Sequence, residues 1–140
     1  MTAARGKAIS TWRYPDRYST YDVHETPSPE AGYWAVLDEG ELVGYCCFGA
    51  EARVPGVEEE DGTLDVGYGM RPDLVGMGTG RSFVSAILAF AADEFSTDRM
   101  RLLILEWNQR SRKVAEALGF RRTGSVPGAE GDFLVMTRSA

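Results

Sequence analysis

The sequence predicts an α/β (α+β) fold, with a mixed, mostly antiparallel sheet built around a central parallel βαβ unit. A strand-like segment at 63–70 is followed by a glycine-rich bend, an apolar-striped segment at 81–95 and a nearly all-apolar segment at 100–105. Strand, bend, helix and buried strand in this order form a βαβ unit, whose two strands run parallel with a right-handed crossover. Two strand-like segments joined by a turn come before this unit and predict a hairpin.

The first thirty residues are expected to contain little regular structure. Residues 2–12 predict a short helix, and the proline-containing segment 13–30 predicts an irregular arm. Tyr14, Tyr18 and Tyr21 lie in this arm. Aromatic side chains in such an arm usually cap a core, and lining a substrate entrance is the less frequent alternative.

The predicted hairpin has strands at 32–37 and 42–48 with a turn at Gly40. A third strand follows at 63–70, and it contains Gly67 and Gly69. Glycine is a poor strand former, so these two positions indicate a bulge or a close approach of another group.

The remaining elements complete the sheet. The segment 81–95 has a wide apolar face and predicts a helix. A second amphipathic helix is expected after Asn108, which can act as its N-cap, and Gly119 is a good C-terminal cap. Strands are expected at 120–126 and 132–137.

Composition limits the function. The chain has 140 residues with 44% hydrophobic content, which suits one domain spanning 1–140. Its net charge of -6 argues against non-specific nucleic-acid binding. The longest uncharged apolar run, 83–92, is too short for a membrane span, so we expect no membrane partner and a cytoplasmic location. Cys46 and Cys47 are neighbours on one strand and point to opposite faces, so they are expected to pack rather than bind metal.

Charge is unevenly distributed along the chain. The segment 51–65 is acidic and could attract a cationic substrate, although a solvated surface turn is at least as common an explanation. The segment 110–122 is basic. A basic edge there would suit a phosphorylated cofactor, but exposed helix charge is the commoner explanation.

The bend between the third strand and the helix carries Gly76, Gly78 and Gly80. Alternating glycines let the backbone approach a ligand closely, and the N-terminus of the following helix favours an anion. The spacing matches neither a P-loop nor a dinucleotide fingerprint, because Arg81 stands where both motifs need glycine, and the P-loop lysine is also absent. A phosphate-binding bend of another kind is therefore indicated, with a glycine turn that binds no ligand as the alternative.

The bend resembles the pyrophosphate loop [RQ]-x-x-G-x-[GA] of the GNAT superfamily of acyl-CoA N-acyltransferases, although Val75 departs from the usual Arg or Gln. A second match lies downstream, where the N-x-x-[AS] pattern is followed by a short helix and Gly-Phe. The resemblance covers 32–137. The residues on the two motifs are Val75, Gly78, Gly80, Asn108, Ser111, Gly119 and Phe120.

The resemblance implies a sheet that opens into a V between the third strand and the strand ending near residue 105, with acetyl-CoA as co-substrate in that V. Main-chain N–H groups of the loop would hold the pyrophosphate. The family begins with a strand before its first helix, and that strand is expected to be missing here or to lie upstream. The sheet edge left by a missing strand could be covered by a second copy, giving a homodimer. The implied cofactor residues are Met70, Gly76, Met77, Gly78, Thr79, Gly80, Arg81, Asn108 and Ser111.

The resemblance implies direct attack of an amine on the thioester of acetyl-CoA. Some family members carry a glutamate and a tyrosine as base and acid at places that are Leu103 and Ala115 here. That pair is therefore absent. Glu106 or Asp65 is the hypothesis for the base, and Met70 can donate its N–H to the oxyanion. The fallback polar groups are Tyr68 and Tyr45.

Two functions remain open. The first is an N-acetyltransferase acting on a primary amine of a small molecule or of a protein. The second is a non-catalytic acyl-CoA-binding module of the sensor type, which the absence of the usual acid and base keeps in consideration.

Overall fold

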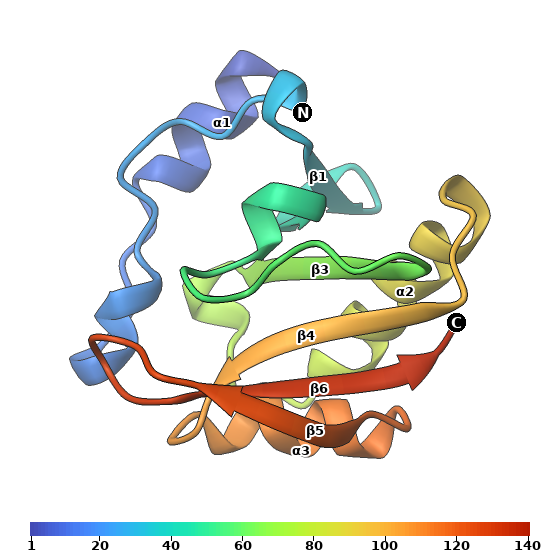
Figure 1. Ribbon diagram of the computed structural model, residues 1–140. Helices are drawn as coiled ribbons and strands as arrows, with labels where there is room; N and C mark the ends of the chain where they lie inside the picture. The colour runs from blue at the N-terminus through green and yellow to red at the C-terminus, as the bar shows by residue number, and fades with distance from the viewer.

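The computed structural model describes all 140 residues, in one mixed sheet with helices on its faces (Figure 1). Short 3-10 turns η1 (Asp16–Tyr21), η2 (Pro29–Ala31), η3 (Gly49–Ala52) and η4 (Pro72–Leu74) occupy the connections. The helices are α1 (Ala3–Ser10), α2 (Gly80–Glu94) and α3 (Gln109–Ala117), and the strands are β1 (Tyr33–Asp38), β2 (Glu41–Phe48), β3 (Thr63–Met70), β4 (Arg99–Leu105), β5 (Arg121–Val126) and β6 (Phe133–Ser139).

The six strands lie in the order β1-β2-β3-β4-β6-β5, and every neighbouring pair is antiparallel except β3 and β4. The predicted mixed sheet with one parallel βαβ unit is therefore confirmed. The crossover from β3 to β4 is helix α2.

The parallel pair is short, and the sheet opens beyond it. Strands β3 and β4 pair only at Thr63 with Arg99, Leu64 with Met100 and Asp65 with Arg101. Beyond these three pairs, β3 continues along β2 as far as Met70 while β4 continues along β6 to Leu105. The two strands therefore diverge, as the predicted V requires.

Gly67 and Gly69 mark a close approach and not a bulge. The register between β2 and β3 is continuous through both glycines. A Cβ at Gly69 would overlap the ring of Tyr45, and one at Gly67 would come within 2.9 Å of the Cys47 sulfur. Because glycine has no side chain, the Tyr45 ring and the Cys47 sulfur can pack directly against the backbone of β3.

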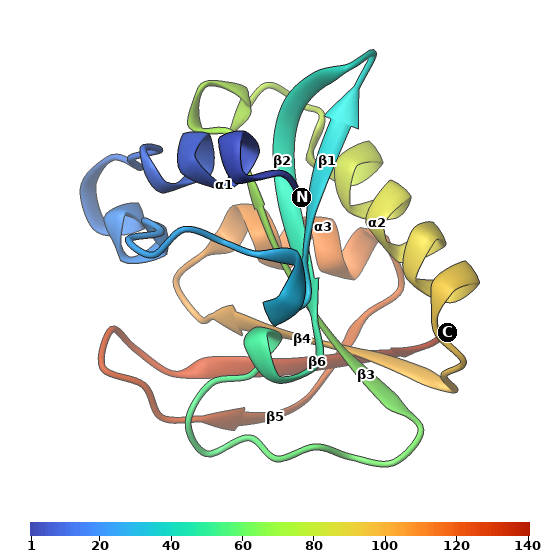
Figure 2. The same ribbon diagram turned by 90° about the horizontal axis from the view of Figure 1, so that it is seen from above.

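Helices α2 and α3 cover one face of the sheet (Figures 1 and 2). The apolar stripe of α2 is buried, as its spacing predicts. It packs on alternate residues of β3 and β4, including Val66, Leu102 and Ile104. The N-terminal arm and the connection from β2 to β3 lie on the other side of these strands. No helix is both long and apolar enough to cross a membrane.

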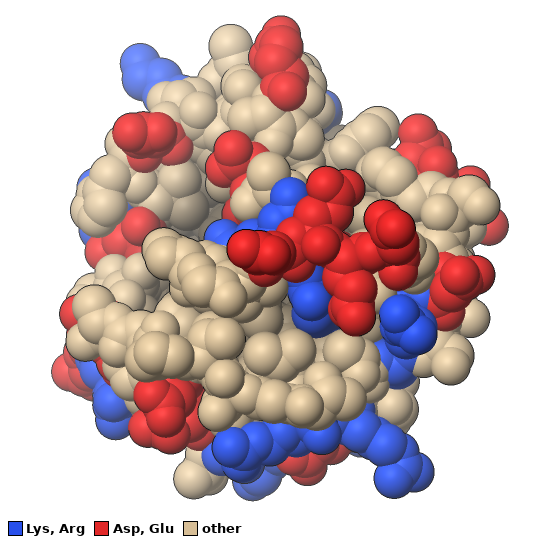
Figure 3. Space-filling model, viewed as in Figure 1, with Lys and Arg blue, Asp and Glu red and all other residues tan.

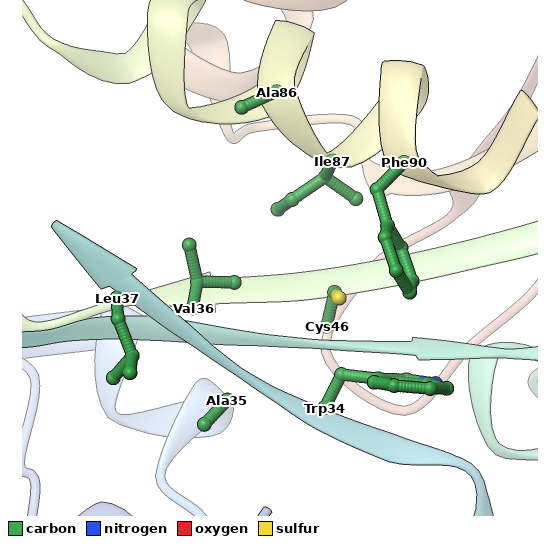
Figure 4. Close-up of a pocket in the computed structure, with 8 residues that line it drawn as sticks. All are labelled: Trp34, Ala35, Val36, Leu37, Cys46, Ala86, Ile87 and Phe90. Carbon is green, nitrogen blue, oxygen red and sulfur yellow. The ribbon is translucent and has the colours of Figure 1, made fainter. Parts of the chain in front are cut away.

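Strand β1 is an edge of the sheet, and an apolar groove of about 200 Å³ lies between it and α2. Figure 4 shows Ile87 and Phe90 pointing from α2 toward Val36 and Trp34 of the edge strand. Trp34 and Phe90 meet edge to face at 4.9 Å. Helix α1 and the turns η1 and η2 come before β1 in the chain, so β1 and β2 are the first two strands of the sheet.

Candidate functional site

A cleft of about 720 Å³ lies where β3 and β4 diverge. It extends through the gap in the sheet. On the helix side it is lined by Tyr68 and the N-terminal ends of α2 and α3, and on the arm side by Tyr45, Gly69 and tyrosines of the arm. A ligand in it would contact both faces of the sheet.

The glycine loop forms one wall at the helix-side mouth of the cleft. Gly76 and Gly78 have φ of +80° and +82°, a conformation that favours glycine. The Met77 N–H donates to Leu74 O at 3.3 Å, but the other N–H groups of the loop have no acceptor within the chain, and Thr79 caps α2 without a side-chain hydrogen bond. Such a row of free donors at a helix N-terminus suits a phosphate or pyrophosphate group. The donors without a partner are those of Gly76, Gly78, Thr79, Gly80, Arg81 and Ser82.

Three basic residues line the cleft together with this loop: Arg81 from α2, and Arg110 and Lys113 from α3. A Cβ added at Gly76 would come within 3.9 Å of the Arg110 guanidinium carbon. No aspartate or glutamate lines the cleft. Positive charge and free N–H groups therefore coincide at one place, which strengthens the case for an anionic ligand.

The end of β3 presents main-chain groups to the gap. Arg71 N–H donates to Val43 O at 2.8 Å, which makes Arg71 and Val43 a hydrogen-bonded pair of the antiparallel ladder. Because such pairs alternate, the N–H of Met70 points away from β2 and toward the opened side. The Met70 carbonyl on the same side accepts the Tyr14 hydroxyl at 2.5 Å. A free amide donor in the gap can hold an oxyanion.

The start of α3 brings Asn108 and Ser111 into the cleft lining. The side-chain oxygen Oδ1 of Asn108 accepts the Ser111 N–H at 3.3 Å, so Asn108 has the N-cap role. Its side-chain nitrogen Nδ2 donates to the Tyr21 hydroxyl at 3.0 Å. The Ser111 hydroxyl lies 3.3 Å from that of Tyr68. Burial raises the pKa of Tyr68, so this phenol keeps its proton at neutral pH.

The arm closes the cleft on the other side. Tyr14, Tyr18 and Tyr21 line it, which favours the less frequent alternative of a substrate entrance over the interpretation of these rings as core caps. Tyr18 meets Trp107 edge to face at 5.2 Å, and the Arg17 guanidinium lies 4.0 Å over the Trp107 ring. These contacts fasten the arm to the end of β4.

Asp65 is not placed to act as a base. Its side chain is 1% exposed, and its oxygens accept from Arg101 Nε at 2.6 Å and from Arg53 at 2.9 Å. It lies in the paired part of β3 and does not line the cleft. Asp65 lies near the V, as predicted, but the structure argues against the role of base, because two arginines hold its carboxylate under the loop that precedes β3.

The other predicted residues divide into two groups. Met70, Gly76, Gly78, Gly80, Arg81 and Tyr68 line the cleft, as do Asn108 and Ser111. Glu106, Met77 and Thr79 do not. The Glu106 side chain is exposed beyond β4 and lies toward Gly131, and the Met77 side chain is 70% exposed. Met77 and Thr79 can contribute to the site only through their main chain.

The acidic segment forms a surface cluster over the connection from β2 to β3, with arginine side chains beneath it (Figure 3). Glu60 lies 3.3 Å from Arg101 and 4.0 Å from Arg99. None of these carboxylates lines the cleft. Their visible partners are arginines of the chain itself, which favours the surface-turn interpretation over recruitment of a cationic substrate.

Arg110, Lys113 and the arm tyrosines are in the cleft lining but were not among the predicted site residues. The signal for the basic residues was the charge of the segment 110–122, but helical periodicity alone does not tell which side chains turn toward the glycine loop. The tyrosines belong to an irregular segment without periodicity. Only the tertiary fold brings them to the gap.

The chain was compared with known proteins. The profile of the Acetyltransferase (GNAT) domain matches residues 5–121. No curated protein shows a significant sequence match.

Several solved structures are similar. The aminoglycoside acetyltransferase AAC(6')-Ib, in complex with paromomycin and acetyl-CoA, superposes with a TM-score of 0.77 at 17% identity, over 99% of this chain and 90% of that one. A putative GnaT-family acetyltransferase from Bordetella pertussis gives a TM-score of 0.61 at 25% identity, over 79% of this chain and 67% of that one. RimL, an acetyltransferase of the ribosomal protein L7/L12 α-amino group in complex with coenzyme A, gives 0.61 at 20% identity, over 76% of this chain and 60% of RimL.

Proposed function

The chain belongs to the Acetyltransferase (GNAT) domain family, and we propose that it is an N-acetyltransferase that moves an acetyl group from acetyl-CoA to a primary amine of a small molecule or protein. Acetyl-CoA is the co-substrate. The observation that carries the proposal is the meeting of free loop N–H groups with three basic side chains at the mouth of a cleft between diverging strands. Pyrophosphate at this mouth would leave the gap for the pantetheine arm and its thioester.

We assign the pyrophosphate to the main chain of Gly76–Arg81, including Met77 and Thr79, with support from Arg110 and Lys113. Free N–H groups and guanidinium forks both match phosphate oxygens. Asn108 and Ser111 are assigned to the cofactor from the start of α3. Each of these residues except Met77 and Thr79 also lines the cleft with its own atoms.

In the reaction, the amine nitrogen attacks the thioester carbonyl carbon and forms the C–N bond. The carbonyl oxygen takes the negative charge, and the Met70 N–H is proposed to stabilise it. Collapse of this intermediate breaks the C–S bond, coenzyme A leaves as the thiolate, and the nitrogen releases one proton to water. We assign to Tyr68 the donation of a proton to the leaving thiolate, since its hydroxyl is protonated and lies in the cleft, and the resulting phenolate takes a proton back from water.

The test is thiol release from acetyl-CoA with a panel of amines, combined with calorimetry of coenzyme A. Binding at micromolar concentration and amine-dependent thiol release support the proposal. At a coenzyme A concentration of 100 times Kd, the stability gain of about 2.7 kcal/mol would also raise Tm by several degrees. A failure to bind coenzyme A would remove the assignment altogether.

A second candidate is a non-catalytic acyl-CoA-binding module, which the lack of a carboxylate in the cleft lining favours. It predicts the same binding and the same Tm shift. It also predicts no thiol release above background with any amine, so the two candidates separate in the release assay.

We also propose that a second copy pairs along edge strand β1. Alternation along β2 implies that Trp34 and Val36 direct their main-chain groups toward β2, so that Ala35 directs its own outward. Ala35→Pro would remove this outward donor without removing a bond to β2. Sedimentation should show a dimer for the parent and a monomer for the variant, and a monomeric parent would contradict the pairing.

A further inference from the structure

The arm side of the cleft, here termed the acceptor chamber, is a chamber of neutral groups. This inference rests on the proposed function and concerns the amine that the chamber takes. Leu103 lines it from β4 and Ala52 from η3. Leu103 lies on the face opposite to Leu102 and Ile104, which are in the core beneath the helices. The chamber is lined by Tyr14, Tyr18, Tyr21, Tyr45, Ala52, Gly67, Gly69 and Leu103.

No carboxylate enters this chamber. Asp65 lies on the same face of β3, but its oxygens are bonded to Arg101 and Arg53. Asp22 of the arm is mostly buried, and it accepts the Tyr14 N–H at 2.8 Å and lies 4.0 Å from Arg13. The charged groups that line the cleft come from α2 and α3 and are all cationic: Arg81, Arg110 and Lys113.

The phenols of the cleft do not accept protons at neutral pH. Burial raises the pKa of Tyr14 to about 12, and burial also raises the pKa of Tyr21, Tyr45 and Tyr68. The hydroxyl geometry agrees, because Tyr14 donates to Met70 O and Tyr21 accepts from Asn108 while keeping its own proton. The lining therefore contains no side chain that could take a proton from an ammonium group.

We propose that the acceptor is a primary amine that is already largely uncharged at neutral pH, as an α-amino group is, and that carries an aromatic or apolar substituent. Only the neutral amine has the lone pair that attacks. With reference pKa values of about 7.8 for an α-amino group and 10.4 for a lysine-type amine, the uncharged fraction at pH 7.4 is roughly 0.3 and 0.001. A site without a base thus meets roughly 300 times more of the attacking, uncharged form with an α-amino group than with a lysine-type amine.

The substituent is assigned from the rings of the chamber. Stacking of an aromatic group against such rings contributes about 0.5–1.5 kcal/mol beyond its buried area. Cations already occupy the rings at its outer end, with Arg17 over Trp107 and Arg110 over Tyr18 at 5.1 Å. A polycation would bring further positive charge next to these guanidinium groups, whereas an apolar group would not.

The test compares three acceptors in the thiol-release assay at saturating acetyl-CoA. Phenylalaninamide and 2-phenylethylamine carry the same ring but differ in the class of amine, and kanamycin is a polycation. We expect kcat/KM at pH 7.4 to be at least 100-fold higher for phenylalaninamide than for either of the others. Glycinamide, with the same class of amine and no ring, should fall at least fivefold below phenylalaninamide.

The pH profile supplies a second readout. With no base on the enzyme, kcat/KM should rise about tenfold per pH unit and level off at the pKa of the acceptor amine. The break, which is the pH at which the profile levels off, should therefore differ between acceptors of different pKa. A break at one pH for every acceptor would show a titrating group on the enzyme and overturn the inference.

Equal or faster reaction with kanamycin or 2-phenylethylamine would overturn it as well, while leaving the acetyltransferase assignment intact. Binding of acetyl-CoA without release by any amine would instead remove the proposed function, and this inference with it.

Discussion

Arg110 shows how a side chain without a distinguishing sequence signal acquires a place in the site. It stands in a helix with several other basic residues, yet it is the one whose guanidinium approaches Gly76 and also lies over the ring of Tyr18. It therefore connects the glycine loop, α3 and the arm. Its charge faces the place where the pyrophosphate is proposed to bind.

Arg110→Ala is expected to weaken coenzyme A binding roughly tenfold, since charge-assisted hydrogen bonds contribute about 1.5–3 kcal/mol and part of that is screened at an open mouth. Arg121→Ala is the matched control, because Arg121 is exposed on the outer strand β5. Calorimetry should find an unchanged Kd for the control. Equal losses in both variants would indicate a general charge effect and contradict a local role for Arg110.

Gly78 allows a conformational test of the loop. Its φ is +82°, and a Cβ there would meet nothing within 4 Å, so Gly78→Ala acts through the backbone alone. Gly56 is a matched control, with φ of +94° and equally open space in the surface connection before β3.

Both variants should lose about 1–2 kcal/mol of unfolding free energy through backbone strain. Only Gly78→Ala should also weaken coenzyme A binding, because a relaxed loop no longer aims its N–H groups at the anion. Urea denaturation and calorimetry measure the two effects separately. Unchanged affinity in Gly78→Ala would contradict the role of the loop.

Strands β3 and β4 depend on an ion-pair network at the closed end of the V. Arg101 reaches from β4 to Asp65 on β3, to Glu60, and to the Glu58 carbonyl at 2.7 Å. Arg53 reaches Asp65 from the other side. This network closes the sheet where the parallel pairing is present, and it ties the acidic connection to β4.

Asp65→Asn should therefore lower the unfolding free energy by about 3 kcal/mol, since removal of one partner leaves buried charge without compensation. Asp73→Asn is the control: Asp73 pairs with Arg71 at 2.7 Å, but its side chain is 65% exposed, so its loss should change little. Urea denaturation of both variants checks this. A similar midpoint shift in both would contradict the network.

The helices and strands were predictable where the spacing of apolar residues follows a helix or strand pattern. The stripe of α2 and the apolar run of β4 identify the βαβ unit, and the glycine spacing identifies the loop. The arm was not predictable, because Tyr14 meets Met70 across 56 positions of sequence and nothing local encodes this contact. The ion pairs that argue against Asp65 as the base were unpredictable for the same reason, since its partner Arg101 is 36 positions away.

Several thiol and phenol groups have a higher pKa in the folded protein than in the unfolded chain, so they keep their protons to a higher pH. Burial raises the pKa of both Cys46 and Cys47 to about 12, and that of Tyr14 and Tyr33 to about 12. The unfolded thiols and phenols titrate near 8.5 and 10. Between these values and 12 the unfolded state binds fewer protons, so stability falls as pH rises.

We therefore expect an unfolding free energy that is nearly constant from pH 7 to 8 and then decreases from about pH 8.5 upward, with a slope that steepens near pH 10. Denaturation at a series of pH values measures this. A free energy that stays flat between pH 8.5 and 10.5 would contradict the burial of these groups.

Only three pairs of strand residues join the backbones of the two sides of the V, and each side is contiguous in sequence. A polypeptide severed between α2 and β4 would yield one fragment with three strands and the glycine loop, and another with three strands and Arg110. Neither would hold coenzyme A alone. Binding of coenzyme A would then require that the two fragments associate, so a signal from their association would measure the cofactor. The fold therefore suits a two-fragment sensor of coenzyme A.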